Sequence, residues 1–292
     1  MENNTKEEQE KIAVITDSCA DVPEELVKKY NIFVLPMVIS CEDGVHRDGV
    51  DIHAADVYEK LKTELPKTSS PMGSDIVDTL DAIKKQGYQK AVAVLLSGGL
   101  SGTINHFRLA VEDLQNLEVA VFDSFQGSIG IGAIALQAAE YIRQGFSFEE
   151  IKKKVEKLIQ NTKVFFSIDT MEFLQKGGRI GKATALAGAM LRIKPILSFD
   201  EDGEIYAAAK VRGHKMVESK LIQLVQERQR NGEKYNIVVA DGGAPEDGDA
   251  LEIKMKELFP DYQFLYRAKI GAALSVYLGS GLLGAGIQFI EG

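Results

Sequence analysis

Small hydroxyl and glycine residues gather at four places along the chain where they could bind an anion. Three of these groups follow apolar runs: Asp17-Ser18, segment 97–103 (SGGLSGT) and Asp123-Ser124. A fourth group, TSSP at 68–71, precedes a helical pattern. Hydroxyls and free backbone N–H groups at a helix start hold anions, but the same residue types also serve routinely as helix caps and turns. The residues alone therefore leave an anionic small ligand and a purely structural role equally open.

The sequence motifs of dinucleotide, nucleotide-phosphate and metal binding are absent or incomplete. The segment from Gly279 to Gly284 matches the dinucleotide fingerprint GxGxxG, but only eight residues follow it, too few for the βαβ unit that the fingerprint requires. Its glycines favour instead a close approach of the backbone to a packed helix or a ligand. The chain has no GxxxxGK[ST] loop, its four histidines lack a zinc-protease spacing, and Cys19 and Cys41 have no CxxC spacing. We therefore predict no cofactor and no metal site.

In the first half of the chain, short β-branched runs alternate with helical patterns. This half is therefore predicted to form a sheet whose strand ends lie close together. The predicted strands are Ile12–Thr16, Ile32–Ser40, Ala91–Leu96 and Val119–Asp123. In the second of these, Pro36 suggests an edge strand or a bulge. The predicted helices lie near 74–86, 101–114, 129–144 and 147–160, and Asp21 is expected to cap a further helix that starts close to it. Such alternation indicates a mainly parallel sheet with helices on both faces, whose carboxyl strand ends form the usual ligand crevice.

The second half has a different pattern. Pro195–Asp200 and Glu204–Val211 flank an Asp-Gly turn, which predicts an antiparallel hairpin. The remaining elements are expected as a strand near 164–169, a helix near 214–230, a strand at 236–241, a helix at 247–259 and a strand at 263–268. We therefore expect a polar tail at 1–10, an α/β domain at 11–161 and a second domain at 162–292 with a mixed sheet in two layers.

Composition limits the partners. The 292 residues carry 34 Lys and Arg against 43 Asp and Glu, a net charge of −9, which argues against binding to nucleic acid phosphates. Hydrophobic residues make up 45%, enough for a folded core. The first residues lack the basic and apolar regions of a secretory signal, and no apolar run is long enough for a membrane span. A cytoplasmic protein without stable membrane insertion is expected.

Taken together, the clusters resemble those of the DegV family of bacterial fatty-acid-binding proteins. The similar segments, in order, are ITDS at 15–18, KTSSP at 67–71, LSGGLSGT at 96–103, FDS at 122–124, LQKGGRI at 174–180, LRIKPIL at 191–197, KVR at 210–212 and the glycine-rich segment 270–284. Each motif is weak alone, but eight in order are specific. The similarity runs from about Lys11 to Ile290.

This resemblance implies two α/β domains with one long-chain fatty acid between them and no catalysis by this chain. Family members present the carboxylate to a separate fatty acid kinase, which forms acyl phosphate for phospholipid synthesis. The architecture also resembles that of dihydroxyacetone kinases. An enzyme or a binding protein for another small anionic ligand in the same crevice therefore remains the alternative.

The resemblance also assigns ligand-binding residues. Hydroxyls of the family's TSxP and SSxLSGT loops hold the carboxylate, which corresponds here to Thr68, with its neighbour Ser69, and to Ser97. Two positions depart from the family pattern. Gly98 replaces a serine and can offer only its backbone N–H, and Tyr277 replaces a histidine, so this position donates a neutral hydrogen bond without carrying positive charge near pH 7.

Two arginines in this acidic chain are predicted to mark the surface where a partner protein binds. Arg179 and Arg212 lie beside expected turns and are predicted to contact the kinase, although most isolated basic residues simply face solvent. An apolar group in the second half is predicted to line a tunnel for the acyl tail, with a place in an ordinary core as the alternative. Its members are Phe165, Phe166, Phe173, Leu186, Met190 and Leu191.

Overall fold

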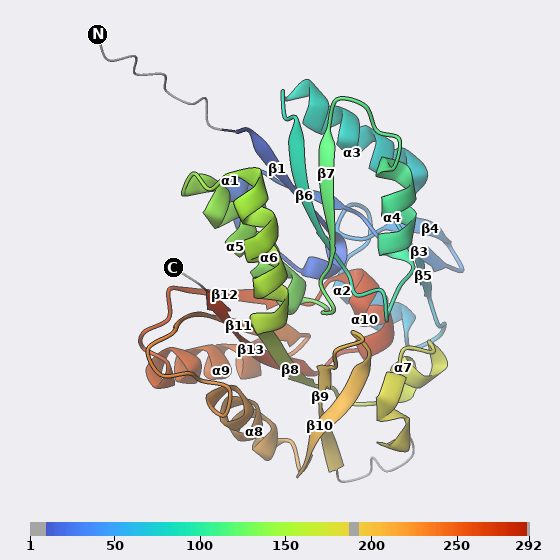
Figure 1. The fold of residues 1–292 in the computed structure, drawn as a ribbon. Coiled ribbons are helices and arrows are strands. Elements are labelled where there is room, and N and C mark those ends of the chain that lie inside the picture. Colours follow the sequence, from blue (N-terminus) through green and yellow to red (C-terminus); the bar gives the residue numbers. More distant parts are fainter. Residues whose placement is uncertain (1–9, 187–192, 291–292) are drawn as a thin grey trace.

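The computed structural model describes residues 10–186 and 193–290, which form two main sheets and one small sheet (Figure 1). In chain order, the strands are β1 (Ile12–Asp17), β2 (Ile32–Leu35), β3 (Val38–Cys41), β4 (Gly44–Arg47), β5 (Lys67–Ser69), β6 (Lys90–Leu95), β7 (Glu118–Asp123), β8 (Thr162–Ser167), β9 (Ile193–Phe199), β10 (Ile205–Arg212), β11 (Lys234–Gly242), β12 (Phe264–Lys269) and β13 (Leu282–Ile290). The helices are α1 (Glu24–Tyr30), α2 (Ala54–Lys60), α3 (Gly73–Lys85), α4 (Thr103–Val111), α5 (Ile129–Arg143), α6 (Phe148–Asn161), α7 (Glu172–Lys176), α8 (Lys215–Gln226), α9 (Pro245–Leu258) and α10 (Ala272–Leu278). Two 3₁₀ helices are η1 (Ser18–Ala20) and η2 (Gly181–Leu186).

The N-terminal sheet is parallel, with strand order β2-β1-β6-β7. Alternate residues of β1 and β6 point to opposite faces, and both faces are apolar, as buried parallel strands require. Helices α3 and α4 cover one face, while α5 and α6 cover the other (Figure 1). This confirms the predicted three-layer arrangement and its parallel sheet.

The C-terminal sheet is mixed, with order β10-β9-β8-β13-β11-β12. Its pairings are antiparallel except for β11 with β12, and the predicted hairpin is the β9–β10 pair. Helices α8 and α9 pack on one face, and α5 and α6 pack on the other. Helix α5 therefore contacts both main sheets, and one continuous apolar core joins them. The chain division at Asn161 stays a prediction.

Three local predictions about the fold were wrong. The run Ile32–Ser40 forms two strands, β2 and β3, because the chain breaks at Pro36 and enters a separate small sheet of order β4-β3-β5. Asp21 does not cap α1, because the N-cap of that helix is Pro23. Asp21 instead ends η1, with its backbone in the left-handed conformation. The segment after residue 281, to which no strand was assigned, forms β13 in the middle of the C-terminal sheet.

The glycines of the apparent dinucleotide fingerprint lie at the start of this missed strand. The backbone of Gly281 has φ +89°, and a Cβ there would lie 2.4 Å from a carboxylate oxygen of Asp169. A Cβ on Gly279 would lie 2.9 Å from the ring of Phe173. The expectation that these glycines permit a close backbone approach is confirmed, since larger side chains would not fit at either place.

Candidate functional site

A cavity of about 240 Å³ lies between the carboxyl ends of the N-terminal strands and the C-terminal sheet. Its walls come from both halves of the chain: the segments after β1 and β6 and the start of α5 on one side, and β8, β11, β13 and α10 on the other. The carboxyl strand ends thus form one wall of the crevice, as expected for an open parallel sheet.

Most of the cavity wall is apolar. Side chains from both sheets and from α5 line it, among them Leu96, Ile129, Val164, Phe166, Phe199 and Leu282. The rings of Phe166 and Phe199 pack 5.6 Å apart between centroids. Gly284 of β13 also lines the cavity, and its missing side chain leaves the floor open. Such a wall can bury a long apolar group but offers it no polar partner.

Polar side chains interrupt this wall in several places, and one group of them brings two hydroxyls and a positive charge together. The Thr68 Oγ1 and the Tyr277 hydroxyl are 2.6 Å apart and share a hydrogen bond. The Arg179 guanidinium lies over the Tyr277 ring, 5.1 Å from its centroid, which is a cation–π arrangement. All three residues line the cavity. Two hydroxyls and one fixed positive charge at the edge of an apolar cavity provide what an anionic head group requires.

Local packing holds these three side chains together. Thr68 lies on the short strand β5, not in a loop as its turn-like sequence suggested, and it pairs with Ile39 of β3. Arg179 is fixed by hydrogen bonds from Nε to the Leu100 carbonyl and from Nη1 to the Gly177 carbonyl, 3.3 Å and 2.7 Å long. A Cβ on Gly177 would lie 2.4 Å from the Tyr277 ring, so this glycine makes room for the tyrosine.

Buried carboxylates fix the start of α10, the helix that carries Tyr277. Asp21 accepts hydrogen bonds from the Gly271 N–H and the Ser128 hydroxyl at 2.8 Å and 2.6 Å. Asp48 accepts from the Ala272 N–H at 2.9 Å and from the Ser18 hydroxyl at 2.7 Å. The group at Asp17-Ser18, a candidate anion site in the sequence, thus serves the protein's own carboxylates.

Burial makes this carboxylate group sensitive to pH. It raises the pKa of Asp17 to about 6, despite hydrogen bonds from the Leu96 and Cys19 N–H groups, and it raises the pKa of Asp48 and Asp21 as well. The folded protein therefore binds protons that the unfolded chain, with ordinary aspartate pKa values, releases. Stability from this source is complete below the unfolded pKa and is lost as the pH rises through the folded value.

We expect the thermal unfolding midpoint to be higher at pH 5.5 than at pH 7.5. Asp17 alone contributes about 1 kcal/mol between these values, which corresponds to roughly 2–4 °C in a protein of this size. Calorimetry at both pH values measures the difference. The variant Asp17→Asn should reduce it, and a midpoint that rises between pH 5.5 and 7.5 would contradict the assignment.

Two predicted ligand-binding residues do not line the cavity. The Ser97 side chain is fully buried; its hydroxyl donates to the Gly203 carbonyl at 2.9 Å and accepts from the Gly99 N–H at 3.1 Å. The Gly98 N–H donates to Asp123 Oδ2 at 3.0 Å. The bond from Ser97 docks the turn of the β9–β10 hairpin onto the loop after β6, and the bond from Gly98 ties that loop to the end of β7. A direct contact of Ser97 or Gly98 with a ligand stays a prediction that this geometry does not support.

Further hydroxyls lie on the wall, and only one of them belongs to a predicted site residue. Ser69, a predicted site residue, lines the cavity together with Ser70 and Ser101. Thr103 links the latter two, because its Oγ1 lies 3.2 Å from Ser70 Oγ and 2.8 Å from Ser101 Oγ. Both serines belong to the hydroxyl clusters in the sequence, but their distance along the chain conceals that they share one wall.

The predicted partner residues lie in different surroundings. Arg179 is half-buried in the cavity wall, whereas Arg212 is exposed at the end of β10. Of the predicted tail-binding residues, Phe165 and Phe166 line the cavity, and Phe173 packs against Gly279 outside its wall. Met190 and Leu191 lie outside the described residues, as does the side chain of Leu186.

None of the helices in the described parts of the chain combines the length and apolar character that crossing a bilayer requires.

Comparison of the whole chain with known proteins identifies its family. The model of the DegV family, described as uncharacterised proteins, matches residues 11–289.

Relatives and solved structures agree with this match. A DegV domain-containing protein of Clostridium acetobutylicum is 38% identical over 94% of this chain and 98% of its own length. The DegV fatty acid binding protein of Bacillus subtilis superposes with a TM-score of 0.86 at 31% identity, over 96% of this chain and 99% of that one. A fatty-acid-binding DegV family protein of Thermus thermophilus gives 0.89 at 26% identity, over 96% and 100%. The full-length match and the shared fold show that this chain belongs to the DegV family.

Proposed function

We propose that the chain is a cytoplasmic carrier that binds one long-chain fatty acid in this cavity. The acyl tail lies between the two sheets, and the carboxylate is held by Thr68, Tyr277 and Arg179. One observation carries the proposal: an apolar cavity whose wall holds one group of two hydroxyls and a guanidinium. The similar proteins of Bacillus subtilis and Thermus thermophilus, described as fatty acid binding, support it.

The energetics assign different tasks to the two ends of the ligand. Burial of an acyl tail gains about 0.8 kcal/mol per methylene, or roughly 11 kcal/mol for fourteen of them before association costs. Hydrogen bonds to the charged head group add about 1.5–3 kcal/mol each. The tail therefore supplies most of the affinity, and the polar group fixes the orientation of the carboxylate.

Native mass spectrometry of gently purified protein tests the proposal. We expect an added mass that corresponds to one fatty acid per chain and disappears after denaturation. A protein that stays empty when incubated with oleic and palmitic acids, or one that carries a nucleotide, would favour the alternative of an enzyme for another anionic ligand.

Tyr277 gives a sharper test of the head-group assignment. Tyr277→Phe removes the hydroxyl that lies 2.6 Å from Thr68, and we expect fatty acid affinity to fall about tenfold. Tyr277→His should strengthen binding below about pH 6.5, where the imidazole gains charge, and so introduce a pH dependence. Titration calorimetry at pH 6 and 8 measures both effects.

The matched control is Tyr58→Phe. Tyr58 contacts the opposite side of α10 through a 3.2 Å hydrogen bond with Ser275, and it does not line the cavity. Its replacement should leave affinity unchanged. If Tyr277→Phe also matches the wild type and Tyr277→His shows no pH dependence, Tyr277 is not part of the site.

We further propose that the bound carboxylate is presented to a fatty acid kinase, which catalyses acyl phosphate formation while this chain contributes no catalytic residue. Arg212 supports this proposal, because it is an exposed positive charge on a protein of net charge −9. Such a charge steers association and fixes orientation more than it adds affinity. Arg179 is assigned mainly to the carboxylate, since it lies in the cavity wall.

Arg212→Ala should leave fatty acid binding unchanged and slow acyl phosphate formation by a cognate kinase at least fivefold at low ionic strength. The rate of acyl phosphate formation at several salt concentrations measures the effect. Arg228→Ala, at another exposed arginine, is the control for net charge. Equal rates for Arg212→Ala and the wild type would remove Arg212 from the interface.

A further inference from the structure

The hairpin formed by β3 and β4 brings together a thiol, a carboxylate and an imidazole. Within the described residues, Cys41, Asp43 and His46 each offer one ligand atom, and these atoms all lie within 4.8 Å of one another. Cys41 ends β3, Asp43 lies in the turn and His46 is on β4. In this register Cys41 pairs with Gly44. The tight turn therefore sets the group, and no distant packing has to bring its members together.

These three side chains suit a transition metal better than a hard cation. Thiolate and imidazole are the ligands that zinc and related divalent ions prefer, and a carboxylate oxygen completes many such sites. His46 Nε2 and Asp43 Oδ1 are 3.1 Å apart, a separation that two ligands of one tetrahedral ion can adopt. All three residues are at least partly accessible to solvent, so an ion can reach them and a water can occupy the fourth position.

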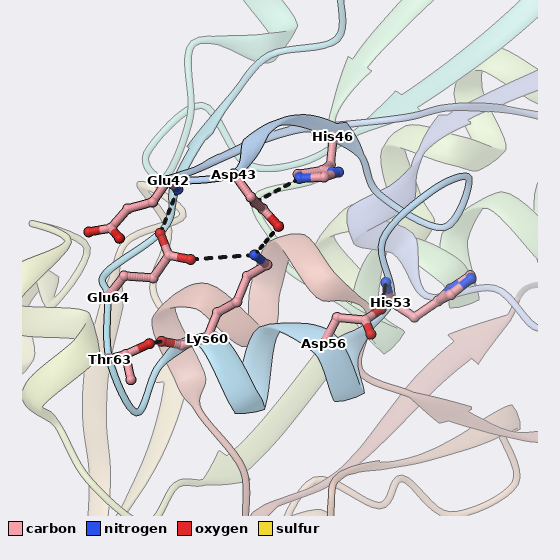
Figure 2. Close-up of polar contacts among 8 residues, drawn as sticks. All are labelled: Glu42, Asp43, His46, His53, Asp56, Lys60, Thr63 and Glu64. Carbon is pink, nitrogen blue, oxygen red and sulfur yellow. Dashed lines mark hydrogen bonds and ion pairs between the residues drawn. The ribbon is translucent and has the colours of Figure 1, made fainter.

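A positive charge of the protein already lies at this place. Lys60, the last residue of α2, extends its ammonium toward Asp43 Oδ2 at 2.6 Å and Glu64 Oε1 at 3.5 Å (Figure 2). Figure 2 shows Asp43 between the lysine and His46, with one carboxylate oxygen turned to each. The positive charge of Lys60 therefore lies beside the carboxylate that would bind a metal, and it repels a second cation there.

We propose that Cys41, Asp43 and His46 bind one divalent transition-metal ion of the zinc class, and that Lys60 is a built-in competitor for this site. When the metal binds, the Cys41 thiol releases its proton to solvent. The Lys60 ammonium, which pairs with the other oxygen of Asp43 and with Glu64, opposes this binding through its charge. This site is separate from the lipid cavity, whose lining contains none of these four residues. The proposal is independent of the ligand assigned to that cavity.

Titration of the full-length protein with Co²⁺ under reducing conditions tests the proposal, followed by competition with Zn²⁺ against a chromophoric chelator. We expect one equivalent of Co²⁺ to produce a thiolate-to-cobalt charge-transfer band, which Zn²⁺ then removes. Cys41→Ser should abolish the band and weaken Zn²⁺ binding by about 100-fold or more, and His46→Ala should weaken it to a similar extent. Cys19 remains in the Cys41→Ser variant, so a band that persists there would overturn the assignment.

Two further variants separate a metal site from an adventitious surface contact. Lys60→Met removes the competing charge but keeps the length of the side chain, and it should tighten Zn²⁺ binding about tenfold or more. His106→Ala removes an exposed histidine of α4 and should change nothing. Far-ultraviolet circular dichroism establishes that each variant is folded. Unchanged or weaker binding in folded Lys60→Met would contradict the proposed competition, and equal losses in His46→Ala and His106→Ala would overturn the site.

Discussion

Replacing Thr68 with valine and Arg179 with methionine in one protein is expected to lower its affinity for a long-chain fatty acid by about 100-fold or more. Each substitution keeps the approximate size of the side chain while it removes a donor to the carboxylate. Loss of two charge-assisted hydrogen bonds costs at least about 3 kcal/mol, and each 1.4 kcal/mol is a factor of ten in affinity. Titration calorimetry with one fatty acid and the alcohol of equal length measures the loss. The alcohol should lose less, because it carries no charge.

Ser97→Ala is the informative control for this prediction. The Ser97 hydroxyl is bonded to Gly203 and lies outside the cavity wall, so its loss should lower stability by about 1 kcal/mol and leave the preference for acid over alcohol intact. If Ser97→Ala instead removes that preference and the double variant retains it, the head group lies at the loop after β6 and the assignment made here is wrong.

Gly286→Ala is expected to destabilise the whole fold. Gly286 lies in the centre of β13, opposite Val164 of β8 and Val238 of β11. A Cβ there would lie 2.6 Å from a methyl of Val164 and 2.8 Å from the Lys163 carbonyl oxygen. Relief of this overlap must shift a central strand, at a cost of about 2–3 kcal/mol. We expect a fall of roughly 5 °C or more in the unfolding midpoint, measured by calorimetry.

The same strand contains a matched control two residues away. A Cβ on Gly284 would meet its nearest neighbours at 3.4–3.7 Å, which is ordinary contact. Gly284→Ala should therefore leave stability unchanged or slightly higher, since alanine restricts the unfolded chain. Equal losses from both substitutions would show that the space around Gly286 is not what makes glycine necessary there.

The alternation of strands and helices was enough to predict a parallel sheet in the first half and a mixed sheet in the second, because the apolar pattern of each element is local in the sequence. It failed where glycine replaces the side chains that mark a strand. Strand β13 contains Gly284 and Gly286, which interrupt the apolar pattern, and the close neighbours of Gly286 leave no room for a side chain there. The small sheet also escaped prediction, since its strands are short and β5 reads as a turn.

The site was predicted in part for a related reason. Thr68 and Tyr277 came from a family resemblance, and the structure brings them within one hydrogen bond of each other although 209 positions separate them. Nothing in the local sequence could show that Arg179 stacks on Tyr277, because this contact depends on how α7 meets α10. Ser97 is the opposite case. The matching motif places this residue beside the cavity, but its hydroxyl donates a hydrogen bond to the backbone carbonyl of Gly203.

The contact of α5 with both main sheets bears on how a ligand reaches the cavity between them. Five large side chains of this helix are buried in the shared core: Ile129, Ile131, Ile134, Leu136 and Tyr141. To swing the sheets apart would expose them at a cost on the order of 10 kcal/mol, comparable to the stability of a whole domain. Opening by a hinge between the sheets is therefore costly, and under the proposed function the tail would reach the cavity through local openings of its wall. A ligand that exchanges through such openings leaves slowly, so its release rate, more than the binding equilibrium, would set how long it stays in the cavity.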